Sequence, residues 1–237
     1  MIRGTGIDST VKLYLKCNGA NGSTKFYDDS QSHHTVTANG NVKISTDYSK
    51  FGGSSMYFDG NGDYISLPDD GAFNFLHQVG TDGKWTIGFF LRINTGAAGT
   101  RPIIDTTRNT YANSGILISL TAGDSIIVYI ARGDSSSPVV IFTSSVWGYN
   151  ENQWYYMQIS YDQSLSSNNL KIYIDGALFG QATKTGNTSS VLDCEQPYIG
   201  IFDPNLPGSA FDGYIDDYTI RDGVVVDGTK VPTRQRG

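Results

Sequence analysis

The stretch FDGYIDDYTI, residues 211–220, sets two adjacent aspartates among aromatic and branched side chains. This composition predicts a β-strand, in which successive side chains point to opposite faces. Regular alternation puts Asp216 on the same face as Tyr218 and Ile220. Asp217 then points the other way, toward solvent. A carboxylate on an apolar face is costly unless it is hydrogen bonded or binds a metal, so the strand raises the question of what Asp216 binds.

The composition of the chain limits the fold to which this strand can belong. The 237 residues include 28 Gly, 15 Tyr and only 7 Pro, and 17% of them are charged. These numbers favour many short strands joined by tight turns over helices or disorder. A single all-β domain can reach this length. Since no linker, repeat or shift in composition interrupts it, we expect one all-β domain at residues 11–222, with an N-terminal arm at 1–10 and a C-terminal arm at 223–237.

Runs of apolar or alternating residues recur along the domain, with turn residues between them. We expect about fourteen short strands, at residues 11–17, 42–44, 54–58, 63–67, 84–93, 101–106, 115–120, 125–130, 138–142, 154–161, 170–174, 177–182, 197–202 and 214–220. The pair Asp175-Gly176 lies directly between two of them, which predicts a two-residue hairpin turn. Residues 71–77 have room for about one helical turn.

Charge and hydropathy exclude several classes of partner. The net charge is −6, and the 17 Lys and Arg residues are scattered, so we expect no nucleic-acid partner. The first residues have no apolar signal-peptide core, and no apolar run is long enough to span a bilayer. We therefore expect neither a Sec signal nor membrane insertion. Cys17 and Cys194 have no metal-ligand spacing, and they form either a single disulfide bridge or two small buried thiols.

Five phrases in a characteristic order carry a resemblance to a known family. They are SSMYFDGNGDYISLP, WTIGFFLRI, QWYYMQISYD, LKIYIDG and FDGYIDDYTI. Over about residues 13–221 the chain resembles the LamG-like branch of the concanavalin A-like lectin and glucanase superfamily. The phrase KCNGANGSTKFYDDS also looks like versions of this domain found in bacteriophage structural proteins. The resemblance implies a jelly-roll sandwich of two curved antiparallel sheets.

The resemblance also implies a structural calcium ion. In related glucanases, a strand of the form Val-Asp-aromatic-Val near the C-terminus carries a calcium ligand, and Asp216 occupies the matching position here. By the same analogy, the other ligands come from Asn18 and from the turn at Asp59 and Gly60, completed by carbonyl oxygens and water. Many relatives have Asp at the place of Asn18, which would weaken calcium binding here. The alternative is that Asp216 accepts hydrogen bonds from backbone amides or tyrosine hydroxyls without a metal.

Catalysis has little support in the sequence. The superfamily contains retaining glycoside hydrolases, which carry acids on one strand in a Glu-x-Asp-x-Glu row so that two carboxyl groups face the scissile bond. Glu151 and Glu195 are the only glutamates, and neither begins such a row. The adjacent acids Asp28 and Asp29 fall in a loop and are typical of solvated turn residues. The three histidines show no zinc pattern. We expect a non-enzyme, with a glycoside hydrolase as the less favoured alternative.

Loop residues of the kind that bind sugars are present. Aromatic rings stack on the apolar faces of sugars, and amides, carboxylates and guanidinium groups bond the hydroxyls. The candidates for carbohydrate binding are Arg101, Arg108, Tyr111, Asn113, Trp147, Tyr149, Asn150 and Asp203. The alternative for Trp147 is that it closes one end of the sandwich. Trp85 and Trp154, at the starts of strands, are expected to pack inside.

The two ends of the chain and the phage-like phrase favour a structural protein of a virion over a secreted enzyme. The arms contain Gly, Thr and basic residues but too little apolar content for a second core, and free in solution they should be mobile. We therefore expect a lectin-like protein on the exposed surface of a virion, with a glycan and other virion subunits as partners, the latter through the arms. The alternative is a free lectin, secreted without a Sec signal.

Overall fold

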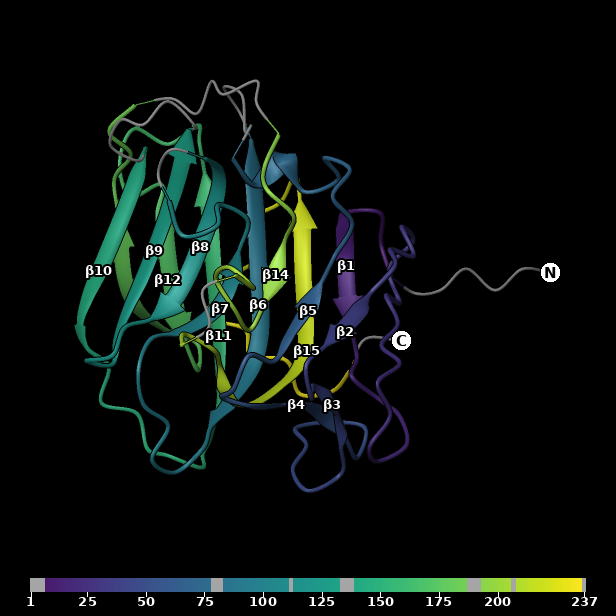
Figure 1. The fold of residues 1–237 in the computed structure, drawn as a ribbon. Helices are drawn as coiled ribbons and strands as arrows, with labels where there is room; N and C mark the ends of the chain where they lie inside the picture. Colours follow the sequence, from purple (N-terminus) through teal and green to yellow (C-terminus); the bar gives the residue numbers. More distant parts are fainter. Residues whose placement is uncertain are drawn as a thin grey trace.

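The protein is described by a computed structural model at residues 7–77, 83–110, 113–132, 139–186, 193–205 and 208–235. Figure 1 shows that its elements are almost all strands. In order they are β1 (Val11–Leu15), β2 (Thr37–Asn39), β3 (Lys43–Ser45), β4 (Ser55–Asp59), β5 (Tyr64–Ser66), the 3-10 helix η1 (Asn74–Leu76), β6 (Lys84–Ile93), β7 (Arg101–Asp105), β8 (Ser114–Leu120), β9 (Ser125–Arg132), β10 (Val140–Val146), β11 (Trp154–Asp162), β12 (Leu170–Ile174), β13 (Ala177–Ala182), β14 (Tyr198–Ile199) and β15 (Asp212–Asp222). The sequence predicts all of these strands except β2, which is short and has no apolar alternation.

The strands form two antiparallel sheets, stacked as two layers (Figure 1). The eight-stranded sheet has the order β13-β12-β11-β6-β15-β4-β3. Its eighth strand, β1, pairs with a different part of β15 from the part that pairs with β4. The seven-stranded sheet has the order β10-β9-β8-β7-β14-β5-β2. The expected all-β jelly-roll sandwich is confirmed. So is the predicted hairpin between β12 and β13, because Asp175 and Gly176 have φ angles of 48° and 80°, as a type I′ turn requires.

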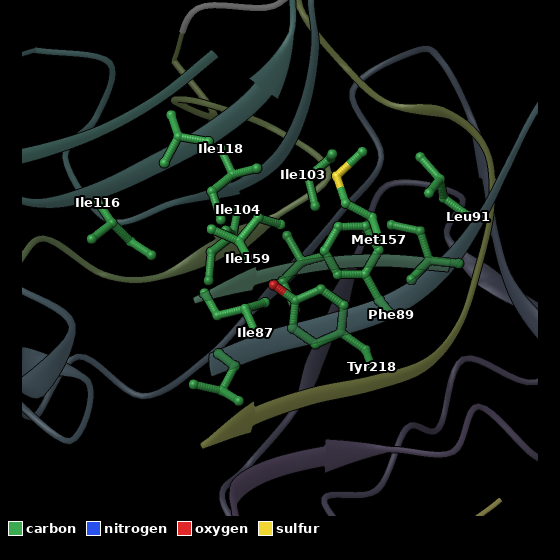
Figure 2. Packing of buried hydrophobic residues seen from close by; sticks show 14 of the residues in the cluster. Ile87, Phe89, Leu91, Ile103, Ile104, Ile116, Ile118, Met157, Ile159 and Tyr218 are labelled. Atoms are coloured by element: carbon green, nitrogen blue, oxygen red, sulfur yellow. The ribbon is translucent and has the colours of Figure 1, made fainter. Parts of the chain in front are cut away.

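The hydrophobic core lies between the two sheets. Figure 2 shows β6 and β11 of one sheet facing β7 and β8 of the other, with Phe89 and Met157 opposite Ile104 and Ile118. All four of these side chains are completely buried. Alternate residues of each strand face this layer, as expected for a sandwich. The core fixes which face of every strand is left for other contacts.

β15 connects more of the fold than any other strand. One edge of it pairs with β6. The other edge is shared, because Asp212–Ile215 pair with β4 whereas Tyr218–Arg221 pair with β1. The change of partner coincides with a β-bulge between Asp216 and Thr219. Such a bulge inserts one extra residue and breaks the alternation of faces.

The bulge corrects the predicted faces of the two aspartates. Asp217 has φ 52°, the left-handed conformation, and it is buried, so the expectation that it faces solvent is wrong. Tyr218 points into the core and stacks on Phe89 with 5.2 Å between ring centroids. Asp216 instead pairs with Phe90, outside the core cluster. Asp216 therefore lies on the outer face of the eight-stranded sheet, opposite to Tyr218.

The segment after β15 crosses the outer face of the eight-stranded sheet. The Thr86 hydroxyl donates to the Val224 carbonyl at 2.9 Å and accepts from the Val226 N–H at 3.0 Å. The side-chain amide of Gln158, a fully buried residue, donates to the Val226 carbonyl at 2.9 Å. These bonds hold the described part of the C-terminal arm against the sandwich, whereas the sequence led us to expect a mobile segment.

We predict that a chain ending at Gly223 is less stable than the full chain. Truncation exposes part of the outer face to water and removes three hydrogen bonds to Thr86 and Gln158, which together contribute about 1.5–4.5 kcal/mol. Urea unfolding should show the free energy of unfolding lowered by at least this amount. The substitution Lys230→Gln, at an exposed position of the same segment, serves as the control and should have little effect. Equal stability of the truncated and full chains would show that the segment does not hold the sheet.

Candidate functional site

A cavity of about 490 Å³ opens on the outer face of the seven-stranded sheet, over β8 and β9. It is bounded by the residues before and after β7, by the β8–β9 turn and by the β14–β15 loop. The residues that line it are Thr100, Asn109, Thr110, Leu117, Thr121, Ile127, Tyr129, Phe202 and Ser209. None of these nine side chains carries a charge. We call this hollow the β8–β9 cavity.

The floor of the β8–β9 cavity is apolar and aromatic. Leu117 and Tyr129 are cross-strand partners on β8 and β9. They form a buried cluster with Ala131 and Phe202 that is separate from the core between the sheets, and Ile127 packs against it. Because strand residues alternate in direction, the odd-numbered residues of β9 face the cavity while the even-numbered ones fill the core. Four hydroxyl residues and an asparagine surround this floor.

The loop after β7 is held by a buried carboxylate. Asp105 accepts hydrogen bonds from the Thr107 N–H at 2.6 Å, the Thr107 hydroxyl at 2.7 Å and the Asn109 N–H at 2.7 Å. The Thr107 hydroxyl lies 3.0 Å from the Tyr129 hydroxyl. Burial raises the pKa of Asp105 to about 7, although these donors favour its charged form. Since Arg108 and Asn109 have φ angles of 50° and 55°, the loop depends on these bonds for its shape.

Arg101 is a structural residue rather than an exposed sugar ligand. Its side chain is 1% exposed. It donates to the Ala97 carbonyl at 2.9 Å, to the Thr121 carbonyl at 3.3 Å and to the Tyr149 hydroxyl at 3.1 Å, and it forms an ion pair with Asp124. These contacts join the β8–β9 turn to two neighbouring loops. Arg101 therefore supports the wall of the β8–β9 cavity from behind.

The structure brings three of the predicted sugar-binding residues near the β8–β9 cavity. Arg108 belongs to the loop held by Asp105, but it forms an ion pair with Glu195 at 3.1 Å. Asn113 donates to the Thr107 carbonyl at 2.9 Å and thereby closes the same loop. Asp203, next to Phe202, accepts from the Asn205 N–H at 2.8 Å. These residues frame the cavity without lining it, and Tyr111 lies outside the described residues.

The remaining candidates form a separate aromatic cluster at one end of the sandwich. Trp147 is 7% exposed and its ring lies 5.2 Å from Tyr149 and 5.1 Å from Tyr155, centroid to centroid. It therefore closes the end of the sandwich, as the alternative for this residue predicted. Asn150 is exposed beside it, and its N–H donates to the Tyr155 hydroxyl at 2.8 Å. The structure does not bring this cluster into the β8–β9 cavity.

The residues that line the cavity were missed because they lack a local signal. Asn109 and Thr110 follow the predicted Arg108 directly. The sequence indicated this loop as a candidate but not which of its residues face the cavity. Tyr129 falls within SIIVYI, a continuous apolar run whose two faces the sequence does not distinguish. A period of two would have revealed the outer face, but the outward Ile127 is as apolar as its inward neighbours. Phe202 was assigned to a predicted strand at residues 197–202, whereas the observed strand β14 ends at Ile199.

Asp216 fits the role of a hydrogen-bond acceptor better than that of a calcium ligand. Its Oδ2 accepts from the backbone N–H groups of Lys50 at 2.8 Å and Phe51 at 2.9 Å. Its other oxygen, Oδ1, is buried and has no hydrogen-bond partner among the described residues. The Asn18 amide, another expected ligand, donates to Gln235 at 2.8 Å. The hydrogen-bonding alternative for Asp216 thus has direct support.

The other two expected calcium ligands lie at the far end of β4. Asp59 pairs with Asp212, four residues before Asp216 along β15, which corresponds to about 13 Å of strand. Gly60 follows Asp59 in the same turn. In the described ranges, no group of three or more His, Cys, Asp or Glu side chains could hold a metal. The four expected residues do not form one site, and calcium binding stays a prediction that chelation can test.

Other sequence expectations are settled in part by burial. Cys17 and Cys194 are buried free thiols, so the alternative without a disulfide holds. Trp85 is completely buried, as expected, but Trp154 is only half-buried. Within the described residues, the structure contains no helix with the length and apolar character needed to cross a membrane.

Comparison with known families agrees with this architecture. Residues 59–227 match the family described as the concanavalin A-like lectin/glucanases superfamily (Laminin_G_3). This region includes the β8–β9 cavity and the whole of β15. No curated protein matches the chain.

Solved structures with the same fold are numerous, and the two described below are distant in sequence. Domain 4 of AbnA, a GH43 extracellular arabinanase from Geobacillus stearothermophilus in complex with arabinotriose, has a TM-score of 0.62 and 17% identity, over 93% of this chain and 97% of that one. The botulinum neurotoxin serotype D binding domain has a TM-score of 0.61 and 17% identity, over 91% of this chain and 49% of that one. The chain thus spans about half the length of the neurotoxin chain. At such identity the likeness concerns the fold alone.

We predict that Asp216 makes stability depend on pH. Burial raises its pKa to about 7 from an ordinary value of 3.8, so between these values the folded state binds more protons than the unfolded state. Stability then falls as pH rises through this window, by about 1.4 kcal/mol for each unit of raised pKa. Asp105 acts in the same direction. Asp216→Asn, which keeps an acceptor for both N–H groups, should remove about half of the slope in urea unfolding between pH 4.5 and 7.5.

Asp217→Asn gives the matched control, because this neighbour is also buried but bonds the Tyr14 hydroxyl instead of the Lys50 loop. It should leave most of the Asp216 contribution in place, because burial, rather than the charge of Asp217, is the main cause of the raised pKa of Asp216. Identical pH profiles for wild type and Asp216→Asn would contradict the assignment. EDTA added at pH 7.5 tests the calcium prediction separately: a lowered melting temperature would support it, and an unchanged unfolding curve would count against it.

Proposed function

Because the chain belongs to the concanavalin A-like lectin and glucanase superfamily, we propose that it is a non-catalytic carbohydrate-binding protein whose sugar site is the β8–β9 cavity. The observation that carries this proposal is the make-up of the cavity. An apolar floor with Tyr129 and Phe202 is surrounded by hydroxyl and amide side chains. Sugars need this combination, because their C–H faces pack on aromatic and apolar surface while their hydroxyls require directed hydrogen bonds.

The charges around the β8–β9 cavity favour a neutral saccharide. All the lining side chains are uncharged. The carboxylates of Asp105 and Asp203 lie just outside it. The guanidinium groups of Arg108 and Arg101 are already paired, with Glu195 and Asp124 respectively. An anionic sugar would lose hydration without gaining a free cation, which disfavours its binding. The volume of about 490 Å³ lies within the usual range for small-molecule sites of roughly 300–1,000 Å³.

A binding role without hydrolysis agrees with the acids near the cavity. Retaining glycosidases need two carboxyl groups flanking the scissile bond. The carboxylate nearest the floor, Asp105, has both oxygens engaged by the loop after β7. Among the neighbours by fold, one is a domain of an arabinanase solved with arabinotriose. Another is a botulinum neurotoxin binding domain in complex with SialylT. Both descriptions support the choice of a saccharide as the ligand class.

A place on the exposed surface of a virion is a second proposal, supported by the phage-like phrase at residues 16–30. The segment after β15 packs on the sandwich, so docking on other virion subunits would use the N-terminal arm or the outer surface of the sheets. Mass spectrometry of purified particles from a phage whose genome encodes the chain tests this role. Absence of the chain from those particles would favour the free lectin.

Substitution Thr100→Trp should abolish neutral sugar binding. Thr100 is half-buried at the rim of the β8–β9 cavity, and an indole there fills the hollow without changing the core. Calorimetric titration with the best neutral ligand from a glycan array that includes arabino- and cello-oligosaccharides should show at least a tenfold loss of affinity, or about 1.4 kcal/mol.

Gln181→Trp supplies the matched control, since Gln181 is exposed on β13 of the other sheet. This variant should bind as the wild type does. Binding that survives Thr100→Trp, or an array without any neutral ligand, would count against the β8–β9 cavity as the sugar site.

A further inference from the structure

A second cavity lies at the opposite sheet, where β1 ends beside β3. Its volume is about 260 Å³, and its lining consists of Lys16, Cys17, Asn18, Lys25, Phe26, Tyr27, Asp29 and Ile44. We call it the Tyr27 cavity. Its floor is the hydrophobic core itself, because Cys17, Phe26 and Ile44 belong to the main buried cluster. It shares no residue with the β8–β9 cavity, so it can be tested independently.

The loop that carries Tyr27 is fixed in place by a buried carboxylate. Asp28 is 5% exposed, which corrects the expectation of a solvated turn residue. It accepts from the backbone N–H groups of Tyr14, Ser30 and His34, each at 2.9 Å. The bond to Tyr14 ties the loop to β1. The Tyr27 side chain therefore projects from a rigid segment.

Tyr27 is the most exposed large aromatic side chain of the described residues, with 66% of its surface accessible. Its sequence neighbours Phe26 and Asp28 are both buried. An exposed ring carried on a rigid backbone segment at the edge of a cavity loses less conformational entropy when a ligand packs on it than a ring on a mobile loop would. Tyrosine is suited to this, because its ring supplies apolar surface and its hydroxyl a polar group.

The opposite wall of the Tyr27 cavity is also held by hydrogen bonds. The side chains of Asn18 and Gln235 bond each other, at 2.8 Å from Asn18 to Gln235 and 3.2 Å in return. Gln235 also donates to the Lys16 carbonyl at 3.0 Å. The end of the segment after β15 thus fixes the Asn18 amide at the cavity.

The charges of the Tyr27 cavity differ from those of the rest of the chain. Lys16 and Lys25 line it together with Asp29, and in the described part of the chain neither lysine forms an ion pair. Among the lining side chains, two ammonium groups stand against one carboxylate, in a protein with net charge −6. Such a concave positive patch attracts an anionic ligand, and ammonium groups bond carboxylates and sulfates strongly.

We propose that the Tyr27 cavity is a second saccharide site and that it binds a sugar ring carrying a carboxylate or a sulfate. The ring packs on Tyr27, the anionic group lies toward Lys16 and Lys25, and the Asn18 amide bonds a hydroxyl. The volume, just below the usual lower limit of roughly 300 Å³ for drug-sized ligands, suits a single sugar residue of a longer chain. The chain would then hold an acidic glycan here and a neutral one in the β8–β9 cavity.

Calorimetric titration of the full chain with tetragalacturonate and with a sulfated carrageenan tetrasaccharide tests this site. At least one of the two should bind, and the pair distinguishes carboxylate from sulfate recognition. Tyr27→Ala and, separately, Lys25→Glu should each weaken that binding at least tenfold. Tyr48→Ala and Lys230→Gln, at exposed positions away from the cavity, should not change it.

Additional ligands and one additional variant make the result of this experiment decisive. Neutral galactotetraose should bind at least tenfold more weakly than the acidic ligand in the Thr100→Trp background, where the β8–β9 cavity is filled. Failure of both acidic ligands, equal binding by Tyr27→Ala, or equal binding of a short polyglutamate would each overturn the acidic-saccharide site. Acidic binding that persists in Thr100→Trp while neutral ligands never bind the wild type would support this site and refute the β8–β9 cavity instead.

Discussion

The β-bulge in the middle of β15 is the constraint on which the rest of the sandwich depends. Left-handed Asp217 lets the strand pass from β4 to β1 as partner while β6 stays on its other edge. Tyr218 is thereby directed into the core against Phe89, and Asp216 is directed to the outer face, where it holds the backbone of Lys50. Aspartate tolerates the left-handed conformation better than most residues. The second of the two adjacent aspartates, Asp217, therefore suits the bulge of the strand.

The sequence predicted the strands well because each is marked by apolar periodicity and bounded by turn residues. The strand β15 was predicted as well, but the faces of its residues were not. One residue in a left-handed conformation changes the face of the residues beyond it, and no periodicity reveals that. The sequence predicted the surroundings of the β8–β9 cavity but not the residues that line it. Arg108 and Asn113 indicated the right loop, but the cavity depends on Tyr129 and Phe202, which come together from separate strands and loops. Long-range packing of this kind leaves no local pattern.

The two cavities differ in the physical terms that determine ligand choice. The β8–β9 cavity is shaped by a buried acid, Asp105, and is lined by uncharged side chains. The Tyr27 cavity is also supported by a buried acid, Asp28, but it is lined by two ammonium groups that form no ion pair in the described part of the chain. In both, a carboxylate fixes the backbone of a loop by accepting N–H bonds. A rigid loop of this type preorganises a binding surface and reduces the entropy lost on binding.

A crystal structure of the protein soaked with a neutral oligosaccharide selected on a glycan array tests the central claim most directly. The account predicts a sugar ring seated over Leu117 and Tyr129, with hydroxyls bonded by Asn109 or the threonines of the rim. An empty β8–β9 cavity, with the sugar bound elsewhere on the molecule, would contradict it.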